Sequence, residues 1–132
     1  MSSDSRATIL IVEDEPLIRR LIRMALADAG HAVLEAGNFG EALEAFRPRA
    51  DAIDLVIMDL VMPGGSGLDV ANELRTLRAD LRILYITGYR NSMLSRCIAE
   101  GAPTAMLLKP FSAADLLARV ADLLGDSSTA TG

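Results

Sequence analysis

The sequence predicts an α/β fold, a doubly wound (βα)5 domain with a five-stranded parallel sheet. Two observations predict it. Short apolar runs alternate with helical stretches five times along the chain, and the runs are continuously apolar rather than alternating. Strands of a parallel sheet that is covered on both faces have this continuous pattern. Connections long enough to hold a helix also require parallel neighbours and right-handed crossovers.

The first half of the chain carries three predicted strands and two predicted helices. The first helix begins at Pro16, where the missing N–H of proline would be unpaired anyway, and Gly30 ends it. The second helix stops before Pro48. The predicted strands are 8–12, 32–36 and 55–58, and the predicted helices are 16–30 and 39–46. The residues expected on the buried face of the first helix are Leu17, Leu21, Ile22, Ala25 and Leu26.

The second half begins with a predicted loop, 60–66, and continues with the remaining elements. Ser112 is expected to cap the last helix, with Asp115 placed as in a capping box. The predicted strands are 82–87 and 105–108. The predicted helices are 67–77, 91–100 and one that starts at Ser112. The residues expected on the inner face of that last helix are Leu116, Leu117, Val120, Leu123 and Leu124.

The composition indicates one domain that stays in the cytoplasm. Residues 8–125 form the predicted domain, 1–7 a flexible N-terminal tail, and 126–132 a flexible tail or linker stub. No apolar run approaches the ~18 residues of a membrane span, and no signal peptide is recognisable. A net charge of −5, from 13 basic and 18 acidic residues, argues against direct binding of nucleic acid.

Polar residues follow four of the predicted strands. Glu13-Asp14 follow the first strand, Asp59 the third and Lys109 the fifth, while Thr87-Gly88 end the fourth. Taken singly, each could be a turn residue or a helix cap. The carboxyl ends of parallel strands share one edge, however, so we expect these side chains to converge there. Crowded carboxylates repel one another unless a cation lies among them, so the pattern indicates a hard divalent metal with oxygen ligands.

These motifs resemble the receiver domain of two-component response regulators, over about residues 8–124. The resemblance implies the flavodoxin-like topology of that family and a role in phosphorelay signalling. Motifs and spacing both match, and the residues that carry the resemblance are Glu13-Asp14, Asp59-Leu60-Val61-Met62-Pro63 with Gly67, Thr87-Gly88 and Lys109-Pro110-Phe111.

The resemblance also implies a role for each site residue. Asp59 would accept a phosphoryl group from the phosphohistidine of a histidine kinase or a histidine phosphotransfer protein. Mg²⁺ would be bound by Asp14, Asp59 and the backbone carbonyl of Val61, with Glu13 acting through water. Lys109, before a cis peptide bond to Pro110, and Thr87 would hold the phosphoryl oxygens. Such a domain supports its own phosphoryl transfer and dephosphorylation, but it is not a turnover enzyme.

The expected switch consists of Thr87, Gly88, Tyr89 and Met106. Met106 stands where most receivers have Tyr or Phe, so the usual aromatic switch is not expected here. We hypothesise that Tyr89 reorients with Thr87 and that flexible Met106 packs behind it. The alternative is that Tyr89 is only a surface residue and Met106 only a core residue, and we give the two hypotheses equal weight. Phosphorylation-dependent homodimerisation is one output compatible with the sequence.

Rival functions lack residues that they need. A haloacid dehalogenase-type phosphatase requires a second Asp where Val61 stands, and Glu13-Asp14-Glu15 would repel the phosphate of FMN in a flavodoxin. A receiver-shaped scaffold that works without phosphorylation is the alternative from another class, and the complete acidic set argues against it. His31 follows Gly30 and is expected in a turn, so the donor histidine lies elsewhere. Both a stand-alone receiver and a part of a hybrid histidine kinase or larger regulator fit the sequence.

Overall fold

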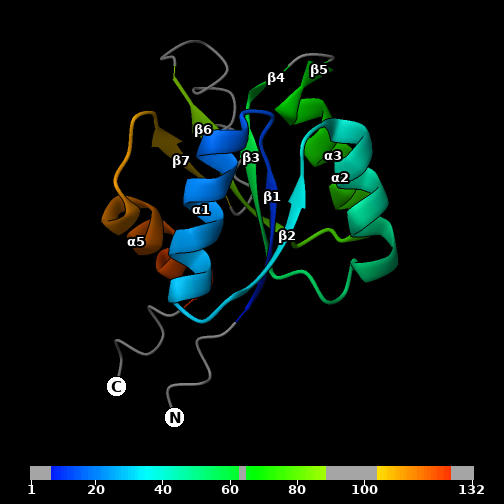
Figure 1. The fold of residues 1–132 in the computed structure, drawn as a ribbon. Coiled ribbons are helices and arrows are strands. Elements are labelled where there is room, and N and C mark those ends of the chain that lie inside the picture. Colours follow the sequence, from blue (N-terminus) through cyan, green and yellow to red (C-terminus); the bar gives the residue numbers. More distant parts are fainter. Residues whose placement is uncertain (1–6, 63–64, 89–103, 126–132) are drawn as a thin grey trace.

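The structure is a computed structural model, and it describes residues 7–62, 65–88 and 104–125 (Figure 1). A single sheet of five parallel strands forms its centre, in the order β2-β1-β3-β6-β7. The predicted fold class is therefore confirmed, while the predicted helix 91–100 falls outside the described residues. The strands are β1 (Thr8–Val12), β2 (Ala32–Ala36), β3 (Leu55–Asp59), β6 (Arg82–Thr87) and β7 (Thr104–Leu108).

Helices cover both faces of this sheet (Figure 1). Helices α1 (Pro16–Asp28) and α5 (Ala113–Leu123) pack on one face, and α2 (Phe39–Phe46) and α3 (Gly67–Leu77) pack on the other. A short 3₁₀ helix, η2 (Arg47–Arg49), follows α2. Every residue of the central strand β3 is buried, because its side chains meet a helix layer on either side. No helix within the described ranges is long and apolar enough to span a bilayer.

The predicted helix ends are confirmed where the sequence specified them. At α5 the Ser112 hydroxyl accepts from the Asp115 N–H at 3.0 Å, and the Asp115 carboxylate accepts from the Ser112 N–H in return. Helix α1 ends at Asp28, and Gly30 follows with a φ of +96°, a left-handed conformation that glycine adopts without strain.

The predicted buried face of α1 is wrong at two positions. Ile22 and Leu26 are buried as expected, but Leu17 and Leu21 are 76% and 64% exposed. At 3.6 residues per turn, both lie about 100° to 140° around the helix axis from Ile22. The apolar stripe of α1 is therefore wider than the strip that contacts the sheet and α5.

The segment expected to be a loop between β3 and α3 contains a small second sheet. Val61–Met62 (β4) pairs with Gly65–Ser66 (β5) in an antiparallel ladder. Strands of two residues are too short to show a hydrophobic period, so the sequence pattern gave no sign of them. The ladder carries the chain from the end of β3 to the start of α3.

Gly67, the first residue of α3, lies against the backbone at the end of β3. A Cβ atom at this position would lie 2.8 Å from the carbonyl oxygen of Asp59 and 3.1 Å from the Cα of Leu60. The N–H of Gly67 also donates to the carbonyl of Leu60 at 3.1 Å. Only glycine allows this close approach of the helix to the strand end.

We expect Gly67→Ala to lower the free energy of unfolding by about 1–3 kcal/mol, because both clashing atoms belong to the backbone and cannot rotate away. Urea denaturation measures the change. Gly88→Ala is the matched control, since a Cβ there would meet no atom of the described residues within 4 Å. Equal stabilities of the two variants would contradict the close packing of α3 on the end of β3.

Candidate functional site

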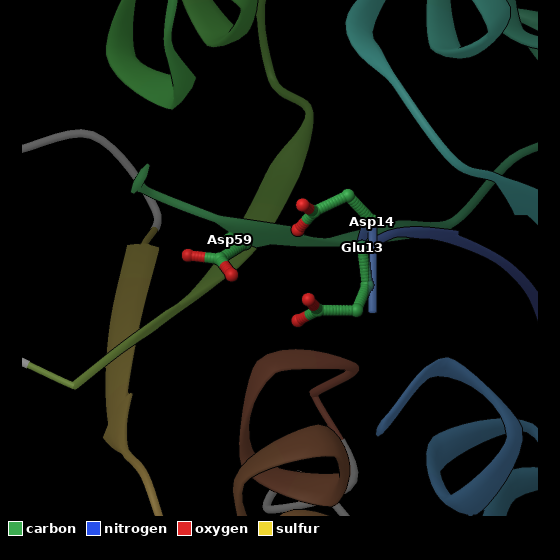
Figure 2. Close-up of side chains that lie close together, drawn as sticks. All are labelled: Glu13, Asp14 and Asp59. Atoms are coloured by element: carbon green, nitrogen blue, oxygen red, sulfur yellow. The ribbon is translucent and has the colours of Figure 1, made fainter. Parts of the chain in front are cut away.

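The adjacent strands β1 and β3 bring three carboxylates together at the carboxyl edge of the sheet. Val12 pairs with Met58 in the parallel register, so Glu13 and Asp14 lie beside Asp59. One oxygen from each of the three carboxylates lies within 4.8 Å of the others, and Figure 2 shows the side chains pointing into the same space. The expected convergence of these carboxylates is confirmed.

Lys109 brings a positive charge to this cluster from the end of β7. Its Nζ donates to Asp59 Oδ2 at 3.0 Å and lies 3.3 Å from Glu13 Oε1. The backbone N–H of Lys109 donates to the carbonyl of Thr87 at 2.9 Å, which joins the ends of β7 and β6. The peptide bond from Lys109 to Pro110 is cis, as the resemblance implied. The lysine is therefore held in the cluster by both its side chain and its backbone.

Glu13 is the most deeply buried member of the cluster, with no exposed surface. Its Oε2 accepts from the N–H of Glu15 at 3.1 Å. Its Oε1 has no hydrogen-bond partner among the described residues, although the ammonium of Lys109 lies at ion-pair distance. Burial raises the pKa of Glu13 to about 7, and the charge of Asp59 adds to this shift, while the Glu15 N–H and Lys109 oppose it. A buried carboxylate oxygen that meets only one ammonium among the described residues, at ion-pair distance, fits a further cation, or water bound to one.

The neighbouring carboxylates also change the acidity of Lys109. Burial alone lowers the pKa of an ammonium, but here the hydrogen bond to Asp59 and the charges of Glu13 and Asp59 outweigh it, so the pKa of Lys109 is raised. The site thus holds a firmly protonated lysine among oxygen donors. Carboxylate oxygens are the ligands that hard cations such as Mg²⁺ prefer, so the residues present fit such an ion.

Of the remaining predicted site residues, the structure describes Thr87, Gly88, Val61 and Met106 but not Tyr89. Thr87 is buried at the end of β6, and Gly88 after it is exposed. Val61 pairs with Ser66 in the small ladder after Asp59, and its carbonyl as a metal ligand stays a prediction. Met106 is half-buried, pairs with Tyr85 and packs against the core on the α2–α3 side. Tyr89 lies outside the described residues, so its part in a switch also stays a prediction.

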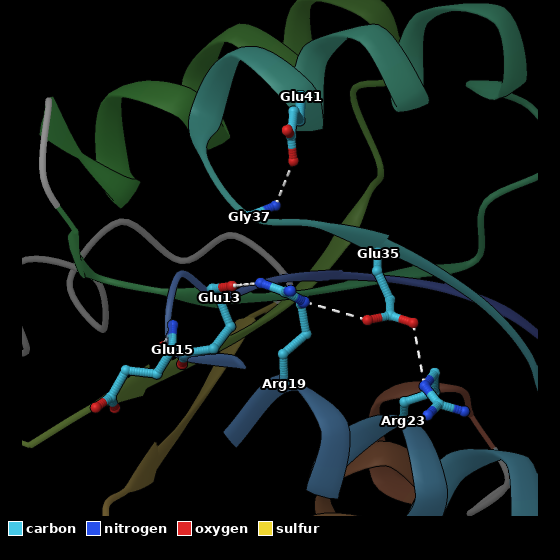
Figure 3. A network of polar contacts seen from close by, with 7 residues as sticks. All are labelled: Glu13, Glu15, Arg19, Arg23, Glu35, Gly37 and Glu41. Carbon is cyan, nitrogen blue, oxygen red and sulfur yellow. Dashed lines mark hydrogen bonds and ion pairs between the residues drawn. The ribbon is translucent and has the colours of Figure 1, made fainter. Parts of the chain in front are cut away.

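Two residues at the site were not predicted from the sequence. Glu15 Oε1 lies 3.7 Å from Lys109 Nζ, although the side chain of Glu15 is largely exposed. Arg19 of α1 donates through Nη1 to the backbone carbonyl of Glu13 at 2.8 Å (Figure 3). Glu15 stands beside Glu13-Asp14, so the acidic run itself was a signal. Arg19 gave none, because an arginine on an amphipathic helix is ordinarily a solvated surface residue.

Comparisons with known proteins agree on one family. The family described as response regulator receiver domain matches residues 9–121. The sensor kinase CckA of Brucella abortus is 35% identical over 118 residues, which cover 89% of this chain and 12% of the kinase. This chain spans no more than about half the length of the curated relatives that it matches.

Solved structures of receiver domains share the fold. A response regulator receiver domain protein from Clostridium thermocellum superposes with a TM-score of 0.83 at 30% identity, covering 93% of this chain and 98% of that one. The response regulator TrrA of Thermotoga maritima, solved in complex with Mg²⁺-BeF, gives a TM-score of 0.75 at 36% identity, covering 89% of this chain and 98% of that protein.

We expect the metal-free protein to lose stability as the pH rises from about 5 to 8. Burial raises the pKa of Glu13 to about 7 from an ordinary value of 4.5, so the folded chain keeps a proton that the unfolded chain has released. This contribution is complete below pH 4.5 and is lost as the pH rises through 7. Urea denaturation with a chelator present should show a fall of about 2 kcal/mol in the free energy of unfolding.

The control is Glu13→Gln, a neutral side chain of the same shape. The difference between wild type and this variant isolates Glu13 from the other titrating groups. Stability curves that stay parallel from pH 5 to 8 would show that Glu13 titrates normally in the folded protein.

Proposed function

We propose a function from one premise: the chain belongs to the response regulator receiver domain family. Asp59 is the phosphoacceptor, and it takes a phosphoryl group from a phosphohistidine of a histidine kinase or a histidine phosphotransfer protein. The observation that carries this proposal is the position of Asp59, buried beside the two carboxylates of Glu13 and Asp14 and hydrogen-bonded to Lys109 at 3.0 Å. A phosphorelay receiver of this kind is not a turnover enzyme on an external substrate.

Mg²⁺ is the proposed cofactor. Asp14, Asp59 and the backbone carbonyl of Val61 hold it directly, and Glu13 acts on it through water. The proposal is supported by the oxygen donor set, by the buried Oε1 of Glu13, which has no hydrogen-bond partner among the described residues, and by the Mg²⁺-BeF complex of the related TrrA. When bound, the ion supplies positive charge to the equatorial oxygens of the phosphoryl group. It also relieves the repulsion among the three carboxylates.

The chain's own residues supply the rest of the chemistry. A carboxylate oxygen of Asp59 attacks phosphorus as the bond from phosphorus to the donor imidazole nitrogen breaks, and the donor histidine leaves with the bonding electron pair. Lys109 contributes a point charge to one phosphoryl oxygen, and the hydroxyl of Thr87 donates to another. Phosphoryl transfer needs little covalent help, so positioning and charge are sufficient for these roles.

The phosphorylated site then acts as a switch. The modification adds roughly −1.5 to −2 charges beside Lys109 and Thr87, whose backbones are joined by a hydrogen bond. Movement of Thr87 therefore carries Gly88 and the end of β7 with it. Tyr89 and Met106 are the residues proposed to pass the change to a surface that binds a partner protein. Phosphorylation-dependent homodimerisation is one form that this output takes in the proposal.

Incubation with a small phosphodonor such as acetyl phosphate tests the proposal through intact-mass spectrometry. We expect wild type to gain one phosphoryl group with Mg²⁺ and none with a chelator. Asp59→Asn should gain none, because its amide is not a nucleophile. Asp54→Asn is the matched control and should be phosphorylated like wild type, since the Asp54 carboxylate accepts from the Thr8 N–H at 2.9 Å and lies before the start of β3, at the end of that strand away from Asp59.

A chain that neither gains the phosphoryl group nor binds Mg²⁺ would contradict the proposal. It would favour a receiver-shaped scaffold that works without phosphorylation. Equal labelling of Asp59→Asn and wild type would show that another residue is the acceptor.

A further inference from the structure

We propose that Arg19 is a positioning residue, which fixes the Glu13-Asp14 turn in the orientation that metal binding requires. The inference rests on the proposed function, because it concerns the same magnesium site. Arg19 does not belong to the acidic cluster, and it offers no ligand to a cation. Its effect is on the backbone from which two of the carboxylates project.

Arg19 contacts that backbone from the side of α1, and Figure 3 shows its guanidinium against the Glu13 carbonyl. Nη1 of its guanidinium donates to the carbonyl of Glu13 at 2.8 Å, and its own backbone N–H donates to the carbonyl of Glu15 at 2.9 Å. On the other side, the N–H of Glu13 donates to the carbonyl of Ala36 in β2 at 3.1 Å. The carbonyl of Glu13 shares its peptide plane with the N–H of Asp14, so the bond from Arg19 sets the direction in which Asp14 leaves the strand.

Arg19 is itself held in place. Its Nε donates to Glu35 Oε1 at 3.1 Å, and Arg23 binds the other oxygen of Glu35 at the same distance (Figure 3). Gly37 leaves room for the guanidinium, since a Cβ there would lie 3.2 Å from Nη1. Partly exposed ion pairs of this kind contribute little to stability. Their geometric effect is to fix the guanidinium against the turn, and groups that orient metal ligands in this way affect affinity strongly.

Charge and position predict opposite effects of removing Arg19. A positive charge near the site repels Mg²⁺, so its loss should tighten binding if electrostatics alone mattered. Loss of the hydrogen bond to Glu13 should instead weaken Mg²⁺ binding. Without that bond the carboxylates of Glu13 and Asp14 are less well oriented, so part of the binding free energy is used to order them. Arg19→Met therefore separates the two by the sign of the change. Arg19→Lys keeps the charge but loses the planar fork that reaches Glu13 and Glu35 together.

The experiment is a calorimetric Mg²⁺ titration of wild type, Arg19→Met, Arg19→Lys and Arg20→Met. We expect both Arg19 variants to bind Mg²⁺ about tenfold more weakly. Arg20→Met, the matched control, removes an exposed charge one residue away and should leave the affinity unchanged or slightly tighter. Amide ¹⁵N shifts of Glu13, Asp14 and Glu15 in the metal-free variants supply a second readout, and they should move in both Arg19 variants only. Circular dichroism checks that each variant is folded.

Each outcome distinguishes the inference from the function on which it rests. Unchanged or tighter binding by Arg19→Met, with a wild type that binds Mg²⁺, would overturn the positioning role and leave the proposed function standing. Should Arg19→Met fail to fold, Arg19→Lys decides in its place, with wild-type affinity counting against the role. A wild type that does not bind Mg²⁺ would overturn the proposed function, and the inference with it.

Discussion

Oxygens of three carboxylates lie within 4.8 Å of one another at the carboxyl edge of the sheet, and the surrounding structure offsets their repulsion. Lys109 supplies one full charge, and the N–H of Glu15 supplies a dipole to Glu13. The turn also leads into the N-terminus of α1, where the helix dipole favours negative charge. Burial nevertheless raises the pKa of Glu13 to about 7, and the remaining repulsion from Asp59 adds to that shift.

The parallel sheet makes this crowding possible. Acidic residues placed after β1 and β3 become neighbours because the two strands run side by side in register. The bond from Lys109 to Thr87 then adds the ends of β7 and β6 to the same edge. The central strands β1, β3 and β6 behind this edge are buried almost throughout, so the carboxylates project from a rigid base. Function in this domain therefore depends on strand order as much as on the charged residues themselves.

Much of the fold could be predicted from the sequence, because its signals are local. Strand ranges follow from apolar runs, and Ser112 with Asp115 gave the start of α5. The convergence of Glu13, Asp14 and Asp59 followed from topology alone. The errors concern contacts that a local pattern does not contain. Periodicity finds the apolar side of α1 but not the width of the surface that covers it, so Leu17 and Leu21 were wrongly expected to be buried. Likewise, the contact between Arg19 and the Glu13 carbonyl could not be predicted, because a backbone carbonyl is present at every position and the residue types give no sign of the contact.

The pairing of Arg19 and Arg23 with one glutamate has a consequence for how related sequences diverge. Glu35 faces two guanidinium groups, so its loss alone would leave two cations of α1 beside each other without their shared anion. Loss of Arg19 alone would remove the hydrogen bonds that Arg19 donates to the carbonyl of Glu13 and to Oε1 of Glu35. We therefore expect a lineage that loses one member to replace the others as well. The three positions should be inherited as a unit, even though they lie on two elements and none of them belongs to the acidic cluster.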